Sequence, residues 1–111
     1  MKNMPIMGNL VGDPELRMSN KGRPMCNMRL GYGSKNNPLY IDLLALDQLA
    51  INCTECLGKG DSIVGEGSLI MQEWEDKNGN KRDSIKILVH RLGPDLIRHQ
   101  VKISRTGSPE E

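Results

Sequence analysis

The stretch LYIDLLALDQLAINCTECLGKGDSIVGEGSLI, residues 39–70, changes its apolar period twice and so decides the fold. Residues 39–46 are apolar on both faces of an extended chain, which is typical of a buried strand. In residues 47–60, four side chains recur at the spacing of a helical apolar stripe: Leu49, Cys53, Cys56 and Leu57. Residues 61–74 return to a strand pattern. Two glycines interrupt that strand and predict a bulge or a sharp bend: Gly65 and Gly67.

The boundaries between these elements carry their own signals. Asp47 can cap the start of the helix, and Gly58 or Gly60 can end it. The pair Asn78-Gly79 is a strong hairpin-turn signal. The strands on either side of that pair are therefore expected to form one long hairpin.

Outside this stretch the pattern predicts three more strands. A short apolar strand in residues 4–16 ends in a turn at 12–14. Residues 25–33 alternate apolar and polar side chains, and residues 83–90 do the same. Polar loops are expected at two places: 19–24 and 35–38. The chain order is therefore strand, strand, strand, helix, strand, strand.

This order predicts an all-β fold, the five-stranded OB-fold barrel, with one short helix between strands three and four and a long hairpin between strands four and five. A β-sandwich or an α+β meander is the alternative. The chain has 111 residues, enough for one compact domain, which we place at residues 1–100. We interpret residues 101–111 as a short, flexible C-terminal tail.

Charge is unevenly distributed along the chain, although the net charge is only +1. Residues 1–35 carry six basic and two acidic side chains (+4), residues 36–76 one basic and eight acidic (−7), and residues 77–111 eight basic and four acidic (+4). A polyanionic partner is possible if the two basic segments meet on one face. The sequence contains no signal peptide and no long apolar run, which favours a cytoplasmic protein with reduced thiols.

Cys53 and Cys56 form a Cys-x-x-Cys motif, the spacing of a redox pair or of half a zinc site. Both lie on the predicted apolar stripe, and the sequence has no second cysteine pair. His90 and His99 lack ligand spacing. We therefore favour core packing for both cysteines and predict no metal and no cofactor. No arrangement typical of an active site is visible, so we predict that the chain is not an enzyme.

A colinear set of short motifs over residues 4–93 resembles bacterial single-stranded DNA-binding proteins. The set comprises Gly8-Asn9-Leu10, Asp13-Pro14-Glu15, Arg17, the strand 39–46, Lys59-Gly60, Glu66-Gly67, Leu69, Trp74, Asn78-Gly79 and Arg82. The resemblance implies an OB-fold that assembles as a homotetramer, less often a dimer. It also implies sequence-nonspecific binding of single-stranded DNA in replication, recombination and repair, at the nucleoid. It implies no catalysis, no metal and no membrane.

Trp74 is the only tryptophan and stands before a charged turn, so it is expected to be exposed. The resemblance implies that it stacks on bases, an interaction worth about 1–3 kcal/mol per base. Tyr40 falls where the family has another stacking residue, and the resemblance places Ile41 in a subunit interface. The alternative for both aromatic residues is packing within the fold.

Basic residues from the two positive segments are the predicted phosphate contacts: Arg17, Lys21, Arg23, Arg29, Lys35, Lys77, Lys81, Arg82 and Lys86. Solvated surface charge is the alternative for each. Several family positions depart from the usual pattern, and Asp42 stands in place of a usual arginine. The chain ends in SPEE, without the acidic-hydrophobic tip that recruits partner proteins in the family. We therefore expect weaker DNA binding and find no sequence support for recruitment through a tail.

A second hypothesis of a different class follows from these departures. It is an OB-fold protein–protein interaction module of a primosome or regulatory complex, with weak nucleic-acid binding. The acidic segment 36–76 is its main support in the sequence. Salt-sensitive oligonucleotide binding is required only by the first hypothesis.

Overall fold

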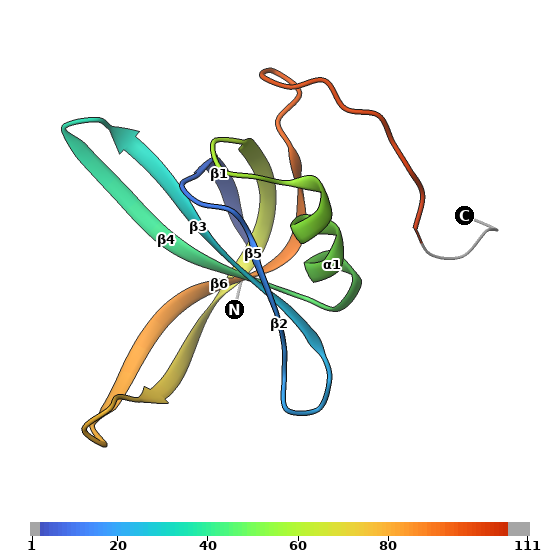
Figure 1. Ribbon diagram of the computed structural model, residues 1–111. Coiled ribbons are helices and arrows are strands. Elements are labelled where there is room, and N and C mark those ends of the chain that lie inside the picture. The colour runs from blue at the N-terminus through green and yellow to red at the C-terminus, as the bar shows by residue number, and fades with distance from the viewer. Residues whose placement is uncertain (1–2, 107–111) are drawn as a thin grey trace.

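The computed structural model describes residues 3–106 and contains, in that part of the chain, strands and one helix (Figure 1). The elements follow in chain order: β1 (Met4–Leu10), β2 (Glu15–Met18), β3 (Pro24–Ser34), β4 (Asn37–Leu46), α1 (Asp47–Cys56), β5 (Ser62–Glu75) and β6 (Lys81–Pro94). The predicted all-β class and the place of the helix are confirmed.

The strand order in the sheet is β1-β5-β6-β4-β3-β2, and a further pairing of β1 with β3 brings the sheet round into a partly closed barrel. β4 and β6 run parallel, whereas the other neighbours are antiparallel. This is the arrangement of the OB-fold, in which closure removes most of the free strand edges.

The described residues contain six strands where five were predicted, because the first predicted strand has two halves. β1 pairs with β3 through Asn9 and Leu10, and β2 continues along the same strand after a break at residues 11–14. β2 was not predicted as a separate strand because all four of its residues are exposed. Without an inward apolar face, a short strand has no alternation to detect.

The barrel core comes from the inward faces of the strands, as the period-two pattern predicted. Its fully buried members include Leu10, Cys26, Leu43 and Ile63. The helix covers one end of this core with Ala50 and Cys53. In Figure 1, α1 lies on the opposite side of the barrel from two long arms, the β3–β4 and β5–β6 hairpins.

The predicted bend in the glycine-containing strand is present in β5. Its pairing with β6 shifts register between Glu66 and Gly67, which is a β-bulge. A Cβ atom at Gly65 would overlap the backbone carbonyl oxygen of Arg91, and one at Gly67 would overlap that of Leu88. The glycines are therefore required by the close approach of β6 to the bulge.

The predicted start of the helix was wrong. Leu46 is the N-cap residue and makes no side-chain capping bond. Asp47 is instead the first helical residue, at φ 60°, and its carboxylate accepts hydrogen bonds from Arg23. An ion pair with a residue 24 positions earlier in the same chain has replaced the local cap that the residue type favoured. At the other end Leu57 is the C-cap, and the left-handed glycine is Gly60 (φ 91°) in the turn that follows.

The two arms differ in their turns. Residues 35–38 were predicted as a loop, but β4 begins at Asn37, so the β3–β4 turn is only Lys35-Asn36. The β5–β6 turn spans residues 76–80 and contains the predicted Asn78-Gly79 pair. There the Asp76 carboxylate accepts hydrogen bonds from the backbone N–H groups of Asn78 and Asn80.

After β6 the chain stays attached to the barrel. The Ser62 N–H donates to His99 Nε2 over 2.9 Å, and Asn52 Nδ2 donates to Thr106 Oγ1 over 3.3 Å. The remainder of the predicted tail, residues 107–111, lies outside the described residues. Within residues 3–106, no helix has the length and apolarity to cross a membrane.

Candidate nucleic-acid interface

One face of the sheet carries a row of side chains from four strands. Arg29 of β3 is the register partner of Asp42 on β4, Asp42 is the partner of Lys86 on β6, and Lys86 is the partner of Ile70 on β5. Their strand neighbours Leu30 and Leu43 point into the core. Because side chains alternate along a strand, this row faces outward.

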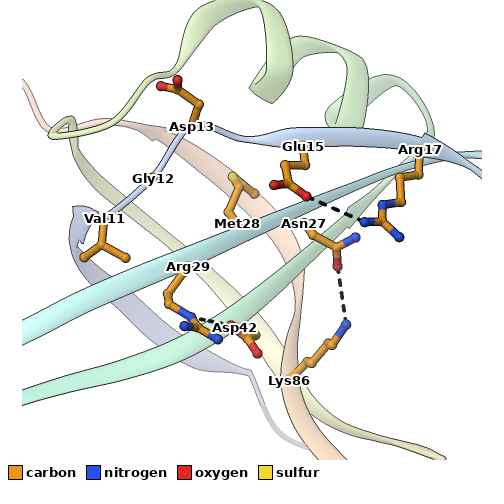
Figure 2. Close-up of a pocket in the computed structure, with 10 residues that line it drawn as sticks. All are labelled: Val11, Gly12, Asp13, Glu15, Arg17, Asn27, Met28, Arg29, Asp42 and Lys86. Carbon is orange, nitrogen blue, oxygen red and sulfur yellow. Dashed lines mark hydrogen bonds and ion pairs between the residues drawn. The ribbon is translucent and has the colours of Figure 1, made fainter. Parts of the chain in front are cut away.

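An open groove of about 550 Å³ has three residues of this row in its floor: Arg29, Asp42 and Lys86 (Figure 2). The bend between β1 and β2 forms one wall, with Val11, Asp13 and Glu15. In Figure 2 the carboxylate of Asp42 reaches the guanidinium of Arg29, and the Lys86 amine reaches the side chain of Asn27. The measured separations are 3.0 Å for Arg29 Nε to Asp42 Oδ1 and 3.3 Å for Lys86 Nζ to Asn27 Oδ1.

Both predicted stacking residues are exposed on this outward face. Trp74 lies on β5 opposite Arg82 and is 51% exposed, as expected from its charged neighbours. Tyr40 lies two residues before Asp42 on β4 and is 58% exposed. A Cβ atom at its register partner Gly31 would be 3.5 Å from the Tyr40 ring, so the ring lies over that glycine beside the groove.

The predicted phosphate contacts do not form one cluster. The groove brings together only Arg17, Arg29 and Lys86. Arg82 stands opposite Trp74 on the β5–β6 arm. The remaining lysines lie at or next to the turns of the hairpins, away from the groove: Lys21, Lys35, Lys77 and Lys81.

Each of the four predicted arginines is paired with a carboxylate that sequence analysis did not assign to it. The pairs are Arg17–Glu15 at 3.8 Å, Arg23–Asp47 at 2.8 Å, Arg29–Asp42 at 3.0 Å and Arg82–Asp76 at 3.2 Å. The Arg29–Asp42 pair follows from the register of β3 and β4, which the sequence alone does not contain. Counting basic residues therefore overstated the positive charge available to a ligand.

Two of these carboxylates are held firmly in the ionised form. The hydrogen bond from Arg23 keeps the pKa of Asp47 below its ordinary value. Hydrogen bonds from the backbone of Asn80 and Asn78, helped by Arg82, do the same for the pKa of Asp76. Both side chains therefore carry a full negative charge at neutral pH.

Ile41 is half-buried and packs against the barrel core, on the same face of β4 as Leu43 and Ala45. The place of Ile41 in a subunit interface was implied by the resemblance and stays a prediction.

The cysteines divide into two buried and one exposed. Cys26 and Cys53 lie in the core, but Cys56 is exposed, so its predicted place in the apolar stripe was wrong. Burial raises the pKa of the Cys53 thiol to about 12. Among the described residues, no group of three or more His, Cys, Asp or Glu side chains could hold a metal ion. A protonated, buried Cys53 is a poor partner for thiol–disulfide exchange.

One thiol per folded chain is therefore expected to react rapidly with a thiol reagent at pH 8. The reacting group is Cys56, since Cys26 and Cys53 are inaccessible and Cys53 is protonated at that pH. A colorimetric thiol titration checks this count, with the denatured chain giving three. Rapid reaction of two thiols in the folded chain, or a rapid phase that persists in Cys56→Ser, would contradict the assignment.

Comparison with known proteins identifies a family that this chain matches. The sequence profile of the single-strand binding protein family matches residues 1–95. A single-stranded DNA-binding protein of Tropheryma whipplei (strain Twist) is 30% identical over 111 residues, covering 90% of this chain and 60% of that protein. Another from Paenarthrobacter aurescens is 30% identical over 112 residues, covering 91% and 66%. A third, from Deinococcus radiodurans, is 31% identical over 101 residues, covering 83% and 33%.

The chain thus spans between one third and two thirds of the length of these relatives. The family is described as one of binding proteins, with no reaction named, in agreement with the prediction that the chain is not an enzyme. The match over residues 1–95 confirms the resemblance seen in the short motifs and covers all the strands and the helix described above. The chain belongs to the single-strand binding protein family.

Proposed function

We propose that this chain binds single-stranded DNA without sequence preference, through base stacking and phosphate contacts. The observation that supports this best is the position of Trp74, an exposed indole on the same outward face as Tyr40 and the basic groove residues Arg29 and Lys86. The names of the relatives support the same ligand.

The two kinds of contact have different roles. The faces of Trp74 and Tyr40 can stack on any base, because every base has a π-face. Cations along the strand hold the backbone and set its path, without reading sequence. The proposed path runs from the Tyr40 side of the groove, across Arg29 and Lys86, to Trp74 on the β5–β6 arm.

Titration of the intrinsic fluorescence of Trp74 with poly-dT, at low and high salt, tests this function. We expect strong quenching at low salt, because one indole reports one stacking site. We also expect the logarithm of the binding constant to fall with the logarithm of salt concentration. The slope should be about −0.7 for each phosphate contact, or roughly −2 for three contacts. No change at low salt, from protein shown by circular dichroism to be folded, would rule out the proposed binding.

We also propose that the chain acts as a homotetramer or a dimer at the nucleoid, in replication, recombination and repair. The support from the structure is an open strand edge: β1 pairs with β3 only at Asn9 and Leu10, so residues 4–8 have a partner on the β5 side alone. An unpaired edge of this kind is available to a second chain. Light scattering after size-exclusion chromatography measures the assembly directly.

The boundaries of the binding unit remain proposals as well. We propose that residues 1–100 form the DNA-binding domain and that residues 101–111 are dispensable for DNA binding. The His99–Ser62 hydrogen bond supports a boundary after residue 99, since it ties that part of the chain to β5.

The carboxylates paired with the four arginines favour the second candidate, a protein-interaction module. That module predicts no salt-sensitive quenching in the titration above.

A further inference from the structure

We propose that Asp42 restrains DNA binding by occupying the arginine at the centre of the groove, so that removing its charge strengthens binding. The ligand in competition with Asp42 is a phosphate of the polynucleotide backbone. This inference rests on the proposed function and adds to it a residue that sets its affinity.

The charges that line the groove balance one another. Three lining side chains are basic and three are acidic: Arg17, Arg29 and Lys86 against Asp13, Glu15 and Asp42. A groove of zero net charge exerts little attraction on a polyanion, even in a chain with two positive segments. The removal of one acidic charge leaves the groove with a net charge of +1.

The Asp42 carboxylate binds the Arg29 guanidinium, the same group to which a phosphate would bind. Its Oδ1 lies 3.0 Å from Arg29 Nε, and the two residues are register partners on β4 and β3. Carboxylate and phosphate oxygens compete for the same donors of a guanidinium. The Arg29 side chain is 59% exposed, so a phosphate can reach it, but it must displace Asp42 or share the donors with it.

Asp42 also lies between the two central cations of the row. Its register partner on the other side is Lys86, whose amine donates to Asn27 Oδ1 over 3.3 Å. A phosphate that approaches either Arg29 or Lys86 therefore meets the negative charge of Asp42. Like charges at such short range oppose binding.

Two of the other carboxylates near the predicted cations also have structural roles. Asp76 holds the turn of the β5–β6 arm through Asn78 and Asn80. Asp13 accepts a hydrogen bond from the Lys59 N–H over 2.8 Å and so ties two loops together. Within residues 3–106, the Asp42 carboxylate forms a hydrogen bond and ion pair with Arg29 and with no other side chain. Its replacement is therefore the cleanest test of competition.

The test compares Asp42→Asn with the wild-type chain and with Glu66→Gln. The control removes one negative charge from a similar exposed ion pair, Glu66–Arg91 at 3.6 Å, which does not line the groove. Fluorescence anisotropy of a labelled dT oligonucleotide gives the dissociation constant at several salt concentrations. Asp42→Ser is measured in parallel, so that the result does not depend on how one replacement packs.

We expect Asp42→Asn to bind about threefold to tenfold more tightly than wild type at low salt. Its salt dependence is expected to steepen by up to about 0.7, because Arg29 no longer divides its donors between Asp42 and a phosphate. Glu66→Gln is expected to stay within about twofold of wild type. Circular dichroism melts of all variants confirm that the folded chains are compared.

Equal or weaker binding by both Asp42 variants would overturn the inference. Equal strengthening by Asp42→Asn and Glu66→Gln would overturn it too, because the effect would then come from net charge and not from competition for Arg29. Trp74 quenching in the wild-type chain tests the proposed function independently of this inference. If the wild-type chain is quenched and Asp42→Asn binds no better, the function stands and only this inference fails.

Discussion

Replacing Trp74 with alanine is expected to weaken binding of a labelled dT oligonucleotide by roughly fivefold to 150-fold. This range corresponds to about 1–3 kcal/mol, the usual loss when one aromatic platform for a base is removed. The stacking contribution is large here relative to the phosphate contacts, because every predicted arginine already has a carboxylate partner. The Trp74 indole is therefore expected to contribute a large part of the free energy of DNA binding.

Anisotropy of the labelled oligonucleotide is the measurement, since the variant has lost its own fluorophore. Trp74→Phe is the matched control, because phenylalanine keeps a π-face and is expected to retain most of the affinity. Trp74 is 51% exposed, so its loss is expected to change the melting temperature little. Unchanged affinity together with a lowered melting temperature would show that Trp74 serves cross-strand packing opposite Arg82 instead.

Replacing Gly65 with alanine is expected to lower the free energy of unfolding by about 3 kcal/mol or more. The added Cβ would overlap the carbonyl oxygen of Arg91 and approach Leu92 Cα to 3.0 Å. Both groups belong to the backbone of β6, so no flexible side chain can move aside. Either the bulge opens and the β5–β6 pairing is lost locally, or the barrel distorts.

Urea unfolding followed by Trp74 fluorescence measures this loss. Gly93→Ala is the matched control, because Gly93 also lies in the β5–β6 ladder and a Cβ there would meet nothing within 4 Å. Its effect is expected to stay within about 1 kcal/mol. Similar effects of the two substitutions would mean that replacing any strand glycine lowers the free energy of unfolding by this amount. The close approach of β6 at Gly65 would then not be the cause.

Much of the architecture could be predicted from residues 39–70 and their flanks. The period-two pattern, the helical stripe and the interrupting glycines are local signals, and each reports whether a side chain must face a core. Those signals gave the barrel class, the position of α1 and the bend of β5. They failed for β2, which has no buried face, and for Cys56, which follows the stripe but lies where the helix ends in solvent.

The candidate site was predicted less completely. The exposure of Trp74 followed from its charged neighbours and is confirmed. The basic residues were identified from the sequence. The sequence did not show that the four arginines are already paired with carboxylates and so are less available to a phosphate. Asp47 looked like a helix cap because residue type and position both favoured it, whereas the structure pairs it with Arg23, 24 residues earlier in the chain.

By itself, then, the sequence determined which residues face the core, where the chain bends and that an indole stands in solvent, because burial and turn formation leave periodic local traces. Only the tertiary structure decided which charges meet. Arg29 and Asp42 are 13 residues apart, and nothing in either strand's own pattern specifies the register that makes them partners. That register is set by the two-residue turn of the β3–β4 hairpin, Lys35-Asn36, where the sequence predicted a longer loop. The resulting pairing turns a positively charged segment into a groove whose charges balance.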